Sequence, residues 1–165
     1  MIDLLATHNL KTLNHQAIEK LLPHAGKMSL LNKVICADKK KLTATAISHK
    51  EHDNPLRING TLSTLNGIEY AAQAMALHGA LSAVHSGSKN TPQSGYIAVV
   101  RNIEIKIPFF PENAGELIIE VQQLMSNDNG FTYQFQINAQ LKQEQNELIS
   151  GKITVFLTSE HSEKQ

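Results

Sequence analysis

Residues 63–84 constrain the fold more than any other stretch of the chain. They read STLNGIEYAAQAMALHGALSAV, with few polar side chains, and predict a helix enclosed by the rest of the protein. Gly79 costs a helix roughly 1 kcal/mol relative to alanine, which favours a packing reason for it. We expect a face of small residues to let the backbone of a curved sheet come close: Ala72, Ala76, Gly79 or Ala80, and Ala83.

A membrane span is the rival interpretation of so apolar a segment. Glu69, Gln73 and His78 are costly in lipid, and a span needs about 20 cleaner residues, so we expect no membrane insertion. Lys plus Arg and Asp plus Glu number 15 each, and this absence of net charge argues against nucleic acid as a partner.

The length of 165 residues suits one domain with a polar tail at 159–165. Cys36 is the only cysteine, so a disulfide framework and a thiolate zinc cluster are excluded and a reducing compartment is expected. The first 15 residues have no basic flank, apolar core or cleavage site, so we expect a cytoplasmic protein. No motif predicts a cofactor.

Outside the long helix, the patterns predict one short helix and six strands. The short helix covers residues 14–22, with Asn14 as its N-cap and Pro23 ending it. The strands show alternating apolar residues and lie at 28–37, 42–47, 96–107, 116–125, 131–141 and 148–157. A long helix covered by one antiparallel sheet is an α+β arrangement. Its exposed sheet edges predict pairing of two subunits.

Glu69 is the first candidate for chemistry. It lies in the first turn of the long helix, where backbone N–H groups lack partners and the helix dipole is positive, so those donors suit a thioester carbonyl. Its neighbours on that side are small and mostly apolar, which suits acid/base work. The structural alternative is a capping box, in which Asn66 caps the helix and Glu69 returns to its N–H.

The polar loop 48–60 supplies the second set of candidates, His49 and His52. A neutral imidazole takes a proton alpha to a carbonyl while a carboxylic acid on the helix protonates a leaving hydroxyl, which is β-dehydration. The alternative is that both are surface residues. Arg57 suits a phosphopantetheine phosphate or a carboxylated acyl end, or an ion pair within the loop.

The remaining histidines carry less weight. His24, His78 and His85 have no such setting, and His78 is nine residues from Glu69, so it points to the opposite side of the helix. No spacing of His, Asp and Glu resembles a metal site, and no Ser or Cys lies in a nucleophile motif.

Two strings of the sequence resemble known families. LLPHAGKMSLLNKV is similar to the opening of FabA/FabZ-type 3-hydroxyacyl-acyl carrier protein dehydratases. DNPLRINGTLSTLNGIEYAAQAMALHGAL resembles the ApeP-like dehydratases of aryl polyene clusters. The resemblance runs over residues 18–156 and implies a hot dog fold, with an acyl chain in a tunnel beside the central helix and a site shared between subunits. It also implies a phosphopantetheine-linked acyl chain on an acyl carrier protein, and a homodimer or a heterodimer with a related hot dog subunit.

The resemblance assigns roles residue by residue. Glu69 matches the dehydratase carboxylate, with Gly67 and Ile68 near the thioester-binding turn. FabZ-like enzymes carry their histidine in a GHFPG loop about fourteen residues before the acid. That distance falls on Pro55 here, so His52, or else His49, is the expected base. The expected substrate-binding residues are Asn54, Pro55, Arg57, Gly67, Ile68 and Gln73.

Three functions follow from this pattern. The first is a 3-hydroxyacyl-acyl carrier protein dehydratase of fatty acid or aryl polyene synthesis. The second is acyl thioester hydrolysis on the same fold, with Glu69 activating water. The third is a non-catalytic subunit that pairs with an active relative, which the missing GHFPG histidine favours.

Overall fold

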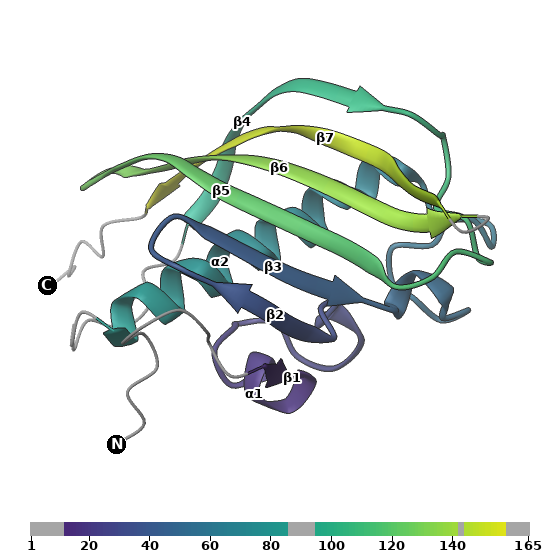
Figure 1. Ribbon diagram of the computed structural model, residues 1–165, viewed down its shortest axis with the longest axis horizontal. Helices are drawn as coiled ribbons and strands as arrows, with labels where there is room; N and C mark the ends of the chain where they lie inside the picture. The colour runs from purple at the N-terminus through teal and green to yellow at the C-terminus, as the bar shows by residue number, and fades with distance from the viewer. Residues whose placement is uncertain (1–11, 86–94, 142–143, 158–165) are drawn as a thin grey trace, which may run out of the picture.

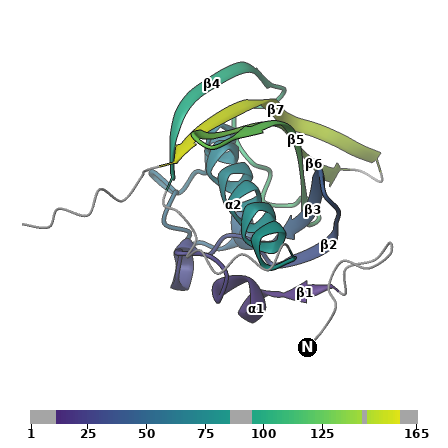
Figure 2. The same ribbon diagram turned by 90° about the vertical axis from the view of Figure 1, so that its left-hand side faces the viewer.

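The computed structural model describes residues 12–85, 95–141 and 144–157. They form one antiparallel sheet that curves around a long helix, α2 (Gly67–His85), as Figures 1 and 2 show. The sheet order is β1-β2-β3-β5-β6-β7-β4. The strands are β1 (Leu13–Asn14), β2 (Lys33–Ala37), β3 (Lys41–Ala46), β4 (Gly95–Ile105), β5 (Leu117–Asn127), β6 (Gly130–Leu141) and β7 (Glu144–Leu157). The expected α+β arrangement is confirmed, with the two-residue β1 as a seventh strand.

The inner face of the sheet and one side of α2 share the core. Large side chains of the helix, among them Tyr70, Leu77 and Leu81, are buried there against the alternating apolar residues of the strands. Gly67 begins the helix close to β7, where an added Cβ would lie 2.8 Å from Ile149 Cγ2. The start of α2 is therefore fixed against the sheet.

The row of small residues predicted to pack on the sheet, which includes Ala76 and Gly79, faces the other way. Ala76 is exposed, and a Cβ added to Gly79 would meet no atom within 4 Å, so the expectation that this face packs on the sheet is wrong. The large side chains take the sheet side because they bury more apolar area there. Within the described residues, this side of the helix is incompletely covered.

The N-terminal part differs from its prediction in length. Asn14 is the N-cap of α1 (His15–Glu19), since its Oδ1 accepts from Ala17 N at 3.0 Å, but the helix ends four residues before Pro23. Strand β2 begins at residue 33 instead of 28. A short 3-10 turn (Gly26–Met28) comes first, and the backbone of Leu30 is then engaged by side chains of Gln73 and Ser48 rather than by a neighbouring strand.

His78 lies on the side of α2 opposite Glu69, as expected. Its Nε2 donates to the carbonyl of Asp38 (2.9 Å), which can only accept, so Nδ1 accepts from the Tyr133 hydroxyl at 2.7 Å. Burial lowers the pKa of His78, which keeps the ring neutral. This contact ties the second half of α2 to β6 and to the turn between β2 and β3.

Two further expectations concern the chain as a whole. No helix in the described part of the chain is long and apolar enough to cross a bilayer. The predicted tail at 159–165 lies outside the described residues.

Candidate active site

Glu69 projects from the first turn of α2 with its side chain 31% exposed. Its Oε1 accepts a hydrogen bond from Gln73 Nε2 at 3.0 Å, one helical turn further on. Gln73 is itself fully buried: Nε2 also donates to Met28 O (2.8 Å), and Oε1 accepts from Leu30 N (3.0 Å). Gln73, expected to bind substrate, is thus placed between Glu69 and the backbone of residues 28–30.

The capping box expected at Asn66 does not form. A 3-10 turn (Thr64–Asn66) precedes α2, and Ser63 caps it by accepting from Leu65 N at 3.3 Å. Asn66 N donates to Ser63 O (3.0 Å) and its side chain donates to Leu56 O (3.2 Å), so Glu69 is not its partner. The Glu69 carboxylate therefore does not cap the N-terminus of α2.

This extra turn also changes the expected thioester-binding amides. The N–H of Gly67 is directed back to the carbonyls of Thr64 and Leu65. Thr64 N donates to Pro108 O at 3.0 Å. Because a 3-10 turn precedes α2, Gly67 N–H already has backbone partners, and Ile68, the next residue, is half-buried.

The histidine that the structure brings to Glu69 is His24. Its Nε2 lies 3.4 Å from Glu69 Oε1, and its side chain is 31% exposed, as is that of the glutamate. Its other nitrogen, Nδ1, is buried with no hydrogen-bond partner. From the sequence, His24, 45 residues before Glu69, was expected to be less important than the loop histidines. The only signal was its place in LLPHAGKM, a string already quoted for its family resemblance.

His49 is fully enclosed. Neither ring nitrogen has a hydrogen-bond partner, and the ring centroid lies 6.3 Å from that of Phe110. Burial, with smaller contributions from the positive charges of Lys50 and Arg57, lowers the pKa of His49 to about 4. The imidazole is therefore neutral at pH 7. No hydrogen bond or ion pair joins it to Glu69.

His52 and Pro55 lie on the exposed surface of the same loop, whereas Asn54 is buried. Asn54 Nδ2 donates to Ser48 O (2.8 Å) and to the Tyr70 hydroxyl (3.1 Å), and its Oδ1 accepts from Leu56 N (2.9 Å). These bonds hold the loop against α2 and use every polar atom of the Asn54 side chain.

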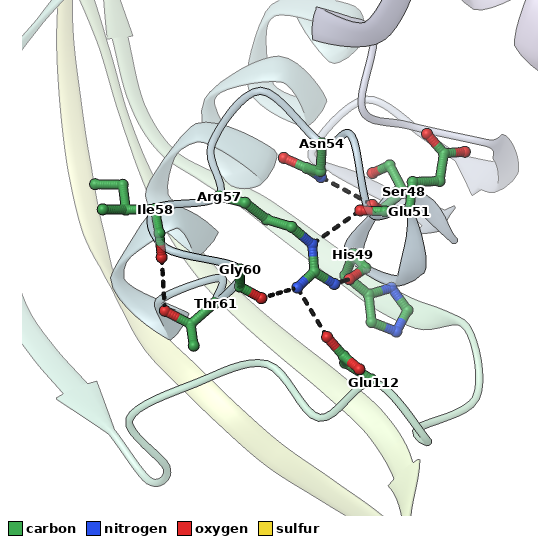
Figure 3. A network of polar contacts seen from close by, with 9 residues as sticks. All are labelled: Ser48, His49, Glu51, Asn54, Arg57, Ile58, Gly60, Thr61 and Glu112. Atoms are coloured by element: carbon green, nitrogen blue, oxygen red, sulfur yellow. Dashed lines mark hydrogen bonds and ion pairs between the residues drawn. The ribbon is translucent and has the colours of Figure 1, made fainter.

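Arg57 holds the same loop from its other side, as Figure 3 shows. Its guanidinium donates to three backbone carbonyls and to one carboxylate: Glu51 O (2.8 Å), Gly60 O (2.7 Å), His49 O (2.8 Å) and Glu112 Oε1 (2.8 Å). Its side chain is only 5% exposed. With these contacts, the guanidinium shapes the loop and has little hydrogen-bonding capacity left for a phosphate.

A groove of about 280 Å³ runs beside this loop at the start of α2. Its lining residues are Leu56, Ile58, Asn59, Thr61, Ser63, Asn66 and Phe109. Glu69 does not line this groove. Among the described residues, no group of three His, Cys, Asp or Glu side chains could hold a metal ion. Chemically, a half-exposed carboxylate held by Gln73 can exchange a proton with a molecule bound beside it.

Comparison with solved structures identifies the fold. The chain is similar to a chain of the dehydratase heterocomplex ApeI:P from Xenorhabdus doucetiae, with 19% identity, a TM-score of 0.74, and 87% of this chain and 91% of the other covered. It is also similar to a thioesterase from Haemophilus influenzae, with 13% identity, a TM-score of 0.60, and coverage of 94% and 97%. The architecture is the hot dog fold.

The family is shown by a profile match. The profile of the ApeP dehydratases matches residues 16–164, almost the whole chain, so the protein belongs to the ApeP-like family. No curated protein matches the sequence.

Proposed function

We propose that the protein acts on 3-hydroxyacyl thioesters carried by acyl carrier protein, as a cytoplasmic dehydratase of fatty acid or aryl polyene type synthesis. The observation that carries this proposal is the Glu69 carboxylate: it is half-exposed at the start of the enclosed helix, and a buried glutamine holds it. Membership of the ApeP-like family supports the same reaction class.

The reaction needs one group to take a proton from C2 and one to protonate the hydroxyl leaving C3. Glu69 is the proposed acid/base carboxylate. The base role of His52 or His49 stays a prediction: His52 is exposed on the loop surface, and His49 is neutral and enclosed. Asn54, Pro55, Arg57, Gly67 and Ile68 remain the proposed surroundings of the acyl thioester.

We also propose that the working form is a pair of hot dog subunits, either two copies of this chain or this chain with a relative. Strand β4 ends the sheet order, and it carries exposed Tyr96, Ile97, Val100 and Ile105. Exposed apolar edge strands are prone to pairing, and the open side of α2 offers further surface to a partner. The dehydratase heterocomplex ApeI:P supports pairing with an unlike subunit.

Product analysis tests the reaction. Purified protein is incubated with a crotonyl thioester and a 3-hydroxyacyl thioester on acyl carrier protein, and the products and free thiol are measured. Hydration or dehydration without thiol release is expected. Thiol release without either reaction would instead establish a thioesterase.

A second candidate is a non-catalytic subunit that shapes the acyl tunnel of an active relative. It is favoured by the exposed position of His52, by the enclosure of His49, and by the heterocomplex found among similar structures. Dehydratase activity that requires an added FabZ-like partner and is unchanged by Glu69→Gln would establish it.

A further inference from the structure

Two nitrogens approach the same oxygen of Glu69. Gln73 Nε2 donates to Oε1 at 3.0 Å, and His24 Nε2 lies 3.4 Å from that oxygen. We propose that His24 is a positioning residue: as an N–H donor on Oε1, it shares with Gln73 the task of turning Oε2 toward the substrate. This inference rests on the proposed function of Glu69 and adds a residue that the family pattern did not supply.

The segment that carries His24 is firmly attached to the start of α2. Gln73 bonds the backbone of Met28 and Leu30, and Ser48 Oγ donates to Leu30 O at 2.9 Å. Lys27 forms an ion pair with Asp53 of the polar loop. These contacts, within and just after the 3-10 turn, hold the segment that follows His24 against the start of α2.

The contact with Glu69 decides where the imidazole carries its proton. Nδ1 is buried without a partner in either tautomer, whereas a lone pair on Nε2 would face the carboxylate oxygen at 3.4 Å and an N–H there is attracted to it. The proton therefore belongs on Nε2, the nitrogen that faces Glu69. In this form Nε2 has no lone pair to accept a proton from substrate, so His24 acts through the carboxylate and not as the base.

The consequence for Glu69 is an asymmetric carboxylate. Oε1 has two nitrogen neighbours, whereas Oε2 has no hydrogen-bond partner among the described residues. A half-exposed glutamate otherwise samples several rotamers, and a misplacement of about 1 Å costs on the order of 10²-fold in rate. Two neighbours on one oxygen restrict that freedom and leave the second oxygen for proton transfer.

Substitution of His24 separates positioning from proton transfer. A glutamine side chain places a neutral N–H about as far from the backbone as His24 Nε2, whereas a leucine side chain has no N–H. With a crotonyl thioester, we expect His24→Leu to lower kcat about 10²-fold with little change in KM, and His24→Gln to recover most of it. His85→Leu, a change of an exposed histidine at the far end of α2, is the matched control and should match wild type.

Two results would overturn the assignment. If His24→Gln is as slow as His24→Leu in folded protein, as judged by circular dichroism, the imidazole itself transfers the proton. If His24→Leu keeps the wild-type kcat, the contact has no role.

A measurement without turnover keeps this inference separate from the proposed function. The ¹⁵N resonances of the imidazoles, assigned with His24→Gln, should show His24 protonated on Nε2 and unprotonated on Nδ1, and Glu69→Gln should shift the Nε2 resonance. An inactive wild type with these signals would reject the proposed reaction and retain the contact. Protonation on Nδ1, or no response to Glu69→Gln, would reject the contact.

Discussion

The buried histidines near the two ends of α2 differ in their hydrogen bonding. Near the C-terminal end, His78 uses both ring nitrogens, one on Asp38 O and one on the Tyr133 hydroxyl. Near the N-terminal end, His49 is equally buried and uses neither, and His24 Nδ1 and Thr64 Oγ1 are also buried without partners.

This difference separates a structural end from a functional end. Buried polar groups are nearly always hydrogen-bonded when folding alone decides their surroundings, as His78 is. Unsatisfied groups cost stability, so their concentration near the start of α2, within the described residues, fits the function proposed for that end. Glu69 and the groove beside residues 56–66 lie at this end.

The largest expected effect tests the functional end directly. Glu69→Gln keeps the shape of the side chain but removes its acid/base capacity, so hydration of a crotonyl thioester should fall about 10²- to 10⁴-fold. Thermal unfolding should change little, because the side chain is half-exposed. Unchanged turnover would remove Glu69 from the chemistry and would support the non-catalytic subunit.

The next effect concerns the pH dependence of stability. The pKa of His49 is about 4 in the folded protein and 6.5 in the unfolded reference, so above pH 6.5 the ring is neutral in both states. As pH falls from about 6.5 to 4, the unfolded chain binds a proton that the folded protein does not. The free energy of unfolding should therefore decrease, by up to about 3 kcal/mol at 1.36 kcal/mol per pKa unit.

Urea unfolding at several pH values measures this loss. His49→Phe removes the titrating ring and preserves an aromatic side chain beside Phe110, so its free energy of unfolding should fall less steeply between pH 6.5 and 4. Equal slopes for the two proteins would show that His49 is hydrated or paired in solution and would weaken the contrast with His78.

A smaller effect is expected at the structural end. Tyr133→Phe leaves His78 Nδ1 buried without its donor, which should lower the free energy of unfolding by about 1–3 kcal/mol. Thioester turnover should be unchanged, because His78 lies on the opposite side of α2 from Glu69. A loss of activity with normal stability would contradict the division between the two ends.

The smallest change in stability is expected for the ion pair between Arg57 and Glu112, beside the loop at the functional end. Glu112 is 60% exposed, and Arg57 keeps three backbone carbonyls without it. Glu112→Gln should therefore change the free energy of unfolding by less than about 1 kcal/mol in urea titrations. A larger loss would show that this ion pair, and not the carbonyls, holds the loop.

Local patterns predicted most of the fold. The N-cap at Asn14 and the alternation of the strands depend on contacts between residues near in sequence. The alternation in β6 was enough to place Tyr133, Phe135 and Ile137 in the core. These rules work because hydrogen bonding and periodic burial act over a few residues.

The contacts of the candidate site were predicted only in part. Glu69 was proposed from its place in the helix and from family resemblance, and the base role of a loop histidine stays a prediction. The prediction favoured the histidines of loop 48–60, which precedes α2. His24 is 45 residues from Glu69, and its Nε2 lies 3.4 Å from the carboxylate. Gln73 was predicted to bind substrate; its side chain bonds the backbone of Met28 and Leu30 and the Glu69 carboxylate, which the sequence did not predict.

By itself, the sequence determined that an apolar helix would be wrapped by an antiparallel sheet and that an acidic residue would stand at its start. Tertiary structure alone decided which side of that helix stays open and which histidine meets the acid. The physical reason is range: periodicity and capping are set by neighbours in the chain, whereas side-chain partners are set by how distant segments pack and by which buried polar groups packing leaves unpaired.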